Sequence, residues 1–231
     1  MDALLEVVAL DVADALAAVQ GGADRLEIVR DMASDGLTPA LETVAAIRDA
    51  VDVPLRVMLR STPTFTVDAA GLDELCAAAD RFRAIGVEEC VLGFLTPEGT
   101  VDLASVRILL EAARPARWTF HRAFDHARDP AAAWAVVTGI AGLDAVLSAG
   151  SAAGLSIEGL RSHLCLPDAG SFLVVGGGLR ADHIPALRAL GLRRFHVGSR
   201  VRHGSRWDHP VDPDAVRRWR RSIDEQAPLV G

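Results

Sequence analysis

The amino-acid sequence predicts an α/β protein with one domain, residues 1–231, that folds as a (β/α)8 TIM barrel. Three observations support this fold class. The chain has 231 residues, and an α/β barrel of roughly 250 residues commonly forms one domain. Half of the residues (50%) are hydrophobic, which is enough for one sizeable core. Short apolar runs and helical patterns also alternate eight times, which favours a closed barrel over a doubly wound open sheet.

The predicted strands are short runs rich in apolar and β-branched residues. In chain order they are LLEVVA (4–9), RLEIV (25–29), PLRVMLR (54–60), CVLGFL (90–95), RWTFHR (117–122), DAVLSA (144–149), FLVVGGG (172–178) and RFHVGS (194–199). Ala- and Leu-rich segments predict helices over 11–20, 39–50, 68–85, 101–113, 130–140, 154–164, 180–190 and 212–226. Several of these helices are expected to begin with a capping residue or a proline, at Thr38–Pro39, Asp68, Asp102, Asp129–Pro130 and Asp212–Pro213.

The composition excludes several classes of partner. A formal net charge of -7 gives no overall attraction to nucleic acid or to an anionic membrane. The first residues carry acids instead of the basic start of a targeting signal, and no apolar run approaches the roughly 18 residues of a membrane span. We therefore expect a cytoplasmic protein without nucleic-acid or membrane partners. We interpret the basic segment RRWRRS (217–222) as a solvated face at a helix end.

The cysteines and the absence of lysine limit the chemistry further. Cys76, Cys90 and Cys165 are odd in number and far apart, which predicts neither a disulfide framework nor a local thiolate metal site. We interpret each of them as a buried structural thiol. The sequence contains no lysine, and this excludes Schiff-base chemistry on a lysine side chain.

Five ionisable side chains are predicted to point into the barrel. Side chains alternate in direction along a strand, and in these strands the more apolar set suits contact with the helices. The residues left facing inward are Glu6, Glu27, Arg60, His121 and His196. Reaction chemistry in this fold gathers at the C-terminal ends of the strands, so their convergence predicts a candidate active site.

Two interpretations of this convergence are open. In the first, the residues form a structural network in which Arg56 or Arg60 neutralises the two glutamates. In the second, Glu6 and Glu27 are acid/base or metal-holding carboxylates, the two histidines carry protons, and Arg60 holds an anionic group. Apolar side chains would fill a barrel at lower cost in free energy, so five ionisable residues together favour the functional interpretation.

Two glycine-rich segments give a second signal. VVGGGLRADH (174–183) follows the seventh predicted strand, and HVGSRV (196–201) follows the eighth. Barrels often bind phosphate through the backbone N–H groups of these two loops. Gly177, Gly178, Gly198 and Ser199 are therefore candidate phosphate-binding residues, with simple tight turns as the alternative. The segments match neither a dinucleotide fingerprint nor a Walker motif.

Stretches along most of the chain carry a family resemblance. They are LLEV at the start, GGADRLEIV (21–29), DGLTPALETV (35–44), VPLRVMLR (53–60), TPEGTVD (96–102), TFHRAFD (119–125), LSAG (147–150), VVGGGLRADHI (175–184) and RRFHVGSR (193–200). In these stretches the sequence resembles the CutC family, named as copper homeostasis proteins. The resemblance implies a (β/α)8 barrel, copper as a candidate ligand, and a site at the barrel mouth that includes His121, Arg122 and Asp125. Asp125 is expected to orient Arg122 or an imidazole.

The sequence departs from the family at the residues most relevant to copper. Family members often carry cysteines after the first-strand glutamate, where this chain has Val7 and Val8, and animal relatives carry one at the position of Val197. Cu(I) prefers soft thiolates, so these differences weaken the implied Cu(I) site. The loop RSTPTFTVD also lacks a second arginine that often follows the one at Arg60.

Two functions from different classes follow. The first is an enzyme acting on a small anionic or phosphorylated substrate of unknown identity, by lyase, isomerase or hydrolase chemistry. The second is copper binding, with His121 and His196 as candidate ligands. A non-catalytic scaffold is a third, weaker interpretation. The sequence is compatible with a homodimer, although no segment of it locates an interface.

Overall fold

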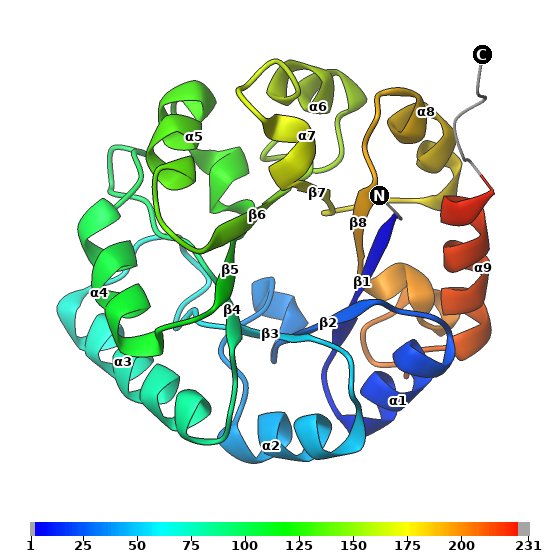
Figure 1. Cartoon of the computed structure of the whole chain (residues 1–231), viewed down its shortest axis with the longest axis horizontal. Helices are drawn as coiled ribbons and strands as arrows, with labels where there is room; N and C mark the ends of the chain where they lie inside the picture. The colour runs from blue at the N-terminus through cyan, green and yellow to red at the C-terminus, as the bar shows by residue number, and fades with distance from the viewer. Residues whose placement is uncertain (1–2, 226–231) are drawn as a thin grey trace.

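The computed structural model describes residues 3–225 and contains a closed barrel of eight parallel strands, with helices around the outside (Figure 1). The strands pair in chain order, and β8 closes the barrel against β1. They are β1 (Leu4–Ala9), β2 (Arg25–Ile28), β3 (Leu55–Met58), β4 (Glu89–Leu92), β5 (Arg117–Phe120), β6 (Leu143–Ser148), β7 (Leu173–Val175) and β8 (Arg194–Val197). The predicted (β/α)8 barrel is confirmed.

The helices follow the strands in alternation, with one addition that the sequence pattern did not predict. They are α1 (Val12–Gln20), α2 (Leu41–Ala50), α3 (Ala69–Ala84), α4 (Leu103–Ala113), α5 (Pro130–Thr138), α6 (Ile157–His163), α7 (Ala169–Phe172), α8 (Ile184–Ala189) and α9 (Pro213–Asp224). The short α7 was missed because it directly precedes β7. The helix predicted over 180–190 divides into a 3-10 turn at Ala181–His183 and α8. The predicted end at residue 226 lies outside the described residues.

Helix starts follow the capping rules at four of the five predicted positions. The side chains of Asp68, Asp102, Asp129 and Asp212 each accept a hydrogen bond from a backbone N–H in the first turn. The predicted start at Thr38–Pro39 is wrong, because α2 begins at Leu41. The hydroxyl of Thr38 instead exchanges two hydrogen bonds with the backbone of Arg60 and so connects the loop after β2 to the loop after β3.

The buried layer outside the strands and the inside of the barrel differ in chemistry. Between the strands and the helices lies an apolar layer, to which outward-facing residues such as Leu5, Val7, Leu26 and Ile28 contribute. Inside the strands, Arg56 is completely buried and forms ion pairs with Glu89 at 2.9 Å and Asp144 at 2.6 Å. Small apolar clusters, including Val8, Met58 and Val91, fill the remaining space.

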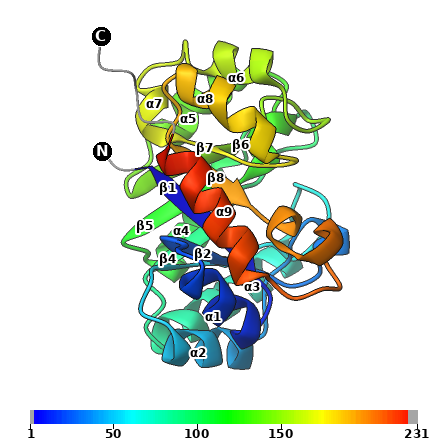
Figure 2. The same ribbon diagram turned by 90° about the vertical axis from the view of Figure 1, so that its right-hand side faces the viewer.

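A long loop connects β8 to α9 (Figure 2), and a buried ion pair attaches it to α1. Arg202 Nη2 donates to Asp14 Oδ2 at 2.5 Å, and the N–H of Val211 donates to Asp14 Oδ1 at 3.0 Å. Both charged side chains are 2% exposed. This attachment holds Trp207 at the C-terminal mouth of the barrel. In residues 3–225, no helix combines the length and the apolar character needed to cross a membrane.

Candidate active site at the barrel mouth

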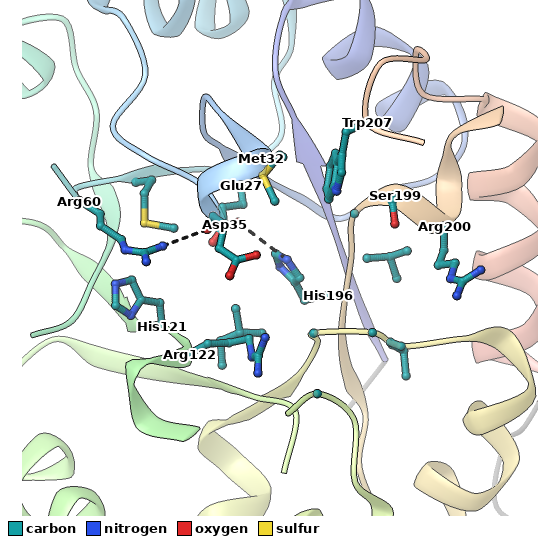
Figure 3. A pocket seen from close by; sticks show the side chains of 18 of the residues that line it. Glu27, Met32, Asp35, Arg60, His121, Arg122, His196, Ser199, Arg200 and Trp207 are labelled. Atoms are coloured by element: carbon teal, nitrogen blue, oxygen red, sulfur yellow. Dashed lines mark hydrogen bonds and ion pairs between the residues drawn. The ribbon is translucent and has the colours of Figure 1, made fainter. Parts of the chain in front are cut away.

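A cavity of about 410 Å³ opens at the C-terminal ends of the strands (Figure 3). Nine residues that the sequence nominated line it, namely Glu27, Arg60, His121, Arg122, Gly177, Gly178, His196, Gly198 and Ser199. Glu6 and Asp125 lie behind the wall and contact lining residues. Several strands end earlier than predicted, so Arg60, His121 and Gly177 belong to loops.

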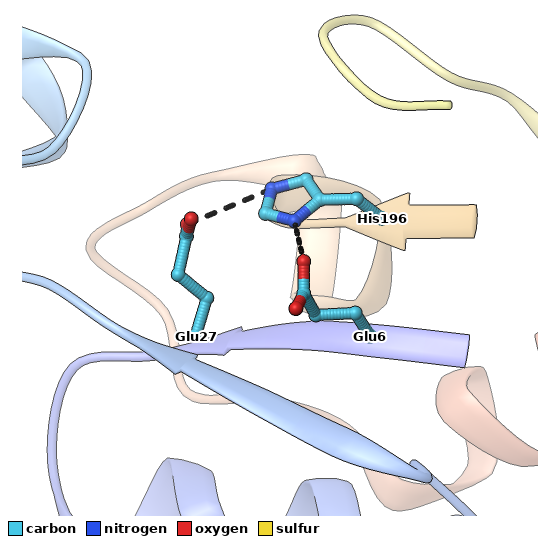
Figure 4. Close-up of side chains that lie close together, drawn as sticks. All are labelled: Glu6, Glu27 and His196. Atoms are coloured by element: carbon cyan, nitrogen blue, oxygen red, sulfur yellow. Dashed lines mark hydrogen bonds and ion pairs between the residues drawn. The ribbon is translucent and has the colours of Figure 1, made fainter. Parts of the chain in front are cut away.

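Glu6, His196 and Glu27 form a row of polar groups on three adjacent strands (Figure 4). His196 Nδ1 lies 2.8 Å from Glu6 Oε1, and His196 Nε2 lies 3.8 Å from Glu27 Oε2. An ionised carboxylate can only accept a hydrogen bond, so His196 donates its Nδ1 proton to Glu6. Its Nε2 atom then faces Glu27, which lines the cavity.

Arg25 neutralises Glu6, a pairing that the sequence interpretation missed. Arg25 Nε donates to Glu6 Oε2 at 2.5 Å, and both side chains are buried. The expected neutralisation by Arg56 or Arg60 through direct pairing is wrong, because the ion pairs of Arg56 are with Glu89 and Asp144. The period of two along β2 could have revealed Arg25, since it faces the same way as Glu27.

The two glutamates differ strongly in acidity. Burial raises the pKa of Glu27 to about 7, and the nearby charge of Glu6 adds to this effect while His196 opposes it. Burial also opposes ionisation of Glu6, but Arg25 and His196 hold its pKa well below the ordinary value. Burial alone would lower the pKa of His196, whereas Glu27 and Glu6 raise it. Near neutral pH, one carboxylate is therefore permanently charged and the other can gain or lose a proton.

The side chain of Arg60 connects two loops by hydrogen bonds. Its guanidinium donates to the backbone oxygens of Ser34, Asp35 and Gly36 after β2, and to those of Pro63 and Thr64 after β3. These bonds engage all three of its nitrogen atoms. The arrangement therefore differs from the free anion ligand that the sequence suggested, and it explains why a buried arginine stands at this loop.

Arg122 is a cation with a donor available to the cavity. Its Nε atom donates to Asp125 Oδ2 at 3.0 Å, and its Nη2 atom donates to backbone oxygens of Ser151 and Ala152. Within the described chain, no hydrogen bond involves Nη1. Gly177 has a φ of 83°, and a Cβ atom there would lie 2.7 Å from Arg122 Nε. The missing side chain therefore lets the guanidinium lie against the glycine loop.

The two glycine loops present unused backbone donors at the cavity. Within residues 3–225, the N–H groups of Gly177, Gly178 and Gly198 have no hydrogen-bond acceptor. Ser199, at the start of a 3-10 turn, also lines the cavity. An anionic group seated between these loops could accept from them and from Arg122.

Comparison with known proteins places the chain in a family. The model of the CutC family matches residues 3–201. A CutC family protein from Xanthomonas campestris pv. campestris is 37% identical over 201 residues, which cover 85% of this chain and 83% of that protein. One from Chromobacterium violaceum is 35% identical over 204 residues, covering 87% of this chain and 82% of that protein. This chain belongs to the CutC family. The predicted family resemblance is thereby confirmed.

Solved structures support the fold of this CutC family member. The CutC protein of Streptococcus agalactiae, whose name refers to copper homeostasis, superposes with a TM-score of 0.77 at 22% identity and covers 85% of this chain and 98% of its own. Phosphoribosyl anthranilate isomerase of Thermotoga maritima superposes with a TM-score of 0.64 at 13% identity, covering 96% and 99%. At these identities the likeness concerns the barrel fold alone.

The donor atoms of this CutC protein do not suit Cu(I). In the described part of the chain, the one group of three His, Cys, Asp or Glu side chains arranged to hold a metal is Glu6, Glu27 and His196. Cu(I) prefers thiolates, and none belongs to this group. Cys90 is buried in β4 and its pKa is raised to about 12 by burial, while Cys76 is on α3. Cys165 is exposed and Cys76 is only partly buried, so the assignment as a buried thiol holds for Cys90 alone. His121 is not part of the group.

The cavity also contains residues that the sequence interpretation did not nominate. They are Met32, Asp35, Met58, Phe65, His126, Leu147, Ala153, Gly154, Leu179, Val197, Arg200 and Trp207. Most lie in the loops that follow the strands, where no periodicity marks which side chains point inward. For His126 the sequence did contain a signal, the polar run HRAFDH (121–126) at the end of the fifth predicted strand. In the structure His126 ends the 3-10 turn Arg122–His126, which follows β5.

Proposed function

We propose that this CutC-family barrel is an enzyme that transfers a proton on a small anionic substrate, with phosphate-bearing compounds as the substrate class. The observation that carries the proposal is Glu27, a buried carboxyl in the cavity wall whose pKa is about 7 and which faces His196 Nε2. A carboxyl with this pKa can act as base and as acid near neutral pH.

The surroundings of Glu27 support proton transfer over a purely structural role. His196 is oriented by Glu6, which is itself held by Arg25. Glu27 has no hydrogen bond to another described side chain, and it forms an ion-pair contact with His196 at 3.8 Å. A structural ion network would place an arginine within 3 Å of this carboxylate, as the Arg56 network does for Glu89 and Asp144.

The opposite wall of the cavity supports an anionic substrate. Arg122 has a free Nη1 group, and Gly177, Gly178 and Gly198 contribute N–H groups without acceptors among the described residues. The cavity of about 410 Å³ is within the roughly 300–1,000 Å³ that small-molecule sites occupy. Lyases, isomerases and hydrolases can all use such a site, since each reaction class includes a proton transfer.

The test uses matched pairs of compounds and one isosteric variant. Glycerol 3-phosphate against glycerol, and glucose 6-phosphate against glucose, are titrated by calorimetry. A wider set of phosphorylated metabolites is then incubated in D2O, and exchange of carbon-bound protons is followed by NMR. We expect binding of phosphorylated members alone, and exchange that Glu27→Gln abolishes while binding persists. Equal binding within the pairs, or exchange that is unchanged in Glu27→Gln, contradicts the proposal.

Copper binding is the second candidate, and the grouping of Glu6, Glu27 and His196 within 4.8 Å of one another is the observation in its favour. One imidazole and two carboxylates suit Cu(II) better than Cu(I), and Glu6 is already committed to Arg25. An anaerobic Cu(I) titration against a chromophoric chelator, run beside His121→Ala and His196→Ala, tests it. We expect no competition with the chelator. Tight one-to-one binding that is lost in either variant would favour copper handling.

A further inference from the structure

The hydrogen bonding of His121 determines which of its nitrogens carries a proton. The backbone N–H of Ala123 donates to His121 Nδ1 at 3.1 Å, so this nitrogen uses its lone pair as an acceptor. The ring is 3% exposed, and burial together with Arg60 lowers the pKa of His121 to about 3. A neutral imidazole that accepts at Nδ1 must carry its proton on Nε2.

The ring is held in place while its Nε2 group has no partner. Phe65 packs against it with ring centroids 5.4 Å apart, and Gly93 lies so close that a Cβ atom would be 2.8 Å from Nδ1. His121 Nε2 is buried and forms no hydrogen bond in the described structure. A buried N–H without an acceptor is costly, and His121 lines the same cavity as Glu27 (Figure 3).

We propose that His121 donates its Nε2–H to a carbonyl oxygen of the substrate, which makes phosphorylated aldehydes, ketones and keto acids the substrate class of this cavity. The inference rests on the proposed function and adds that the carbon from which Glu27 takes the proton lies next to a carbonyl group. It also changes the role that the sequence suggested for His121. A ring with this tautomer offers the cavity a proton donor, and it has no free lone pair for a base or a metal ligand.

The step that follows conserves atoms and electrons. The Glu27 carboxylate takes a proton from the carbon next to the carbonyl, and the C–H electron pair forms a C=C bond. The carbonyl π electrons move to oxygen, where the His121 N–H stabilises the negative charge by a hydrogen bond. Protonated Glu27 then returns the proton to the same carbon while the C=O bond forms again. Where that carbon bears a hydroxyl group, the proton can instead go to the former carbonyl carbon, and the hydroxyl proton then moves to the former carbonyl oxygen so that the new C=O bond forms at the hydroxyl-bearing carbon. No oxidant, reductant or further reactant takes part.

The first experiment reads the tautomer of His121 without any substrate. Long-range ¹H–¹⁵N NMR spectra of labelled wild-type protein are recorded from pH 5 to pH 9, with His121→Gln used to assign the signals. We expect a protonated Nε2, an unprotonated Nδ1, and no titration over this range. A protonated Nδ1, or titration near the ordinary histidine pKa, overturns the proposal.

The second experiment probes the donor with 2-phosphoglycolate, whose carboxylate and phosphate imitate a planar enediolate and its phosphate. His121→Asn keeps an acceptor near the position of Nδ1 and loses the distal donor, whereas His121→Gln places an amide N–H near the position of Nε2. We expect about tenfold weaker binding in His121→Asn than in His121→Gln, and a shift of the Nε2 signal in the wild type. Equal affinities with no shift overturn the assigned substrate class.

The outcomes separate this inference from the proposed function. If Nε2 is protonated and shifts with 2-phosphoglycolate, but no compound in the D2O set exchanges, the proposed proton transfer fails and the donor role stands. If exchange depends on Glu27 but Nδ1 carries the proton, the donor role fails and the proposed function stands.

Discussion

Two sets of charged residues share the inside of this barrel, and they are built differently. Arg56, nearer the N-terminal ends of the strands, has ion pairs with Glu89 and Asp144 and a hydrogen bond to Thr119. Nearer the C-terminal ends, Glu27 has a neighbour at 3.8 Å and no hydrogen bond to another described side chain, and His121 has an unused N–H.

The difference between the two sets separates stability from function. A buried charge with oppositely charged partners at close distance stays ionised and holds strands together. A buried acid without a close cation destabilises the folded protein when it is ionised, and its pKa rises towards neutrality. Four experiments with substituted proteins test this comparison.

The largest effect is expected for Arg56→Met. The change leaves Glu89 and Asp144 without their buried partner, and removal of one member of a buried pair costs about 3–5 kcal/mol. Because the side chains of these two acids are 12% and 29% exposed, we expect the free energy of unfolding to fall by about 3 kcal/mol. Urea unfolding measures it. A loss of less than about 1 kcal/mol would show that this set is not structural.

Glu27→Gln is expected to stabilise the protein, with an effect that depends on pH. The pKa of Glu27 is raised from 4.5 to about 7, so the folded state binds more protons than the unfolded state between these values. Stability from this group therefore falls as pH rises through that window. Relative to the wild type, the glutamine variant should become more stable as pH rises from 4.5 to 7, with a total gain on the order of 3 kcal/mol at pH 8.

The measurement is unfolding of both proteins at several pH values under the same conditions. His121 also titrates differently in the folded protein, and taking the difference between wild type and Glu27→Gln removes its contribution. The pKa of His196 depends on Glu27, so the difference reports the two groups together. An advantage that is constant from pH 4.5 to pH 8 would mean that Glu27 has an ordinary pKa.

Arg122→Met is expected to weaken binding of inorganic phosphate about tenfold, which corresponds to about 1.4 kcal/mol. The reason is loss of the free Nη1 donor beside the glycine loop. Arg180→Met is the matched control, because Arg180 is paired with Asp182 outside the cavity. Calorimetry at constant ionic strength measures both. Equal weakening in the two variants would point to a general charge effect.

The smallest effect is expected at the surface. Arg218 and Asp212 form an exposed pair, with side chains 60% and 36% exposed, so Arg218→Ala should change the free energy of unfolding by less than about 0.5 kcal/mol. Asp212→Ala should cost about 1 kcal/mol, because it also removes the cap of α9. Thermal unfolding measures both variants. Equal losses of stability in the two would mean that the ion pair contributes more than exposed pairs usually do.

The cavity was foreseeable in part from strand periodicity. Alternation along β1, β2 and β8 nominated Glu6, Glu27 and His196, and these three do lie together. The same reasoning assigned Arg60 to anion binding, but β3 ends at Met58, and beyond a strand alternation no longer fixes direction. Arg25 went unnoticed although it shares the inward face of β2, since the pattern alone did not tell which cation would reach Glu6.

The sequence by itself determined the barrel, because apolar periodicity and helix caps are local properties that each segment carries with it. It also determined which residue types meet at the strand ends. Only the tertiary structure decided how these residues pair, since the stagger of the strands and the course of the loops set every distance between them. Protonation depends on those distances and on burial. The acidity of Glu27 and the tautomer of His121 are therefore properties of the folded barrel.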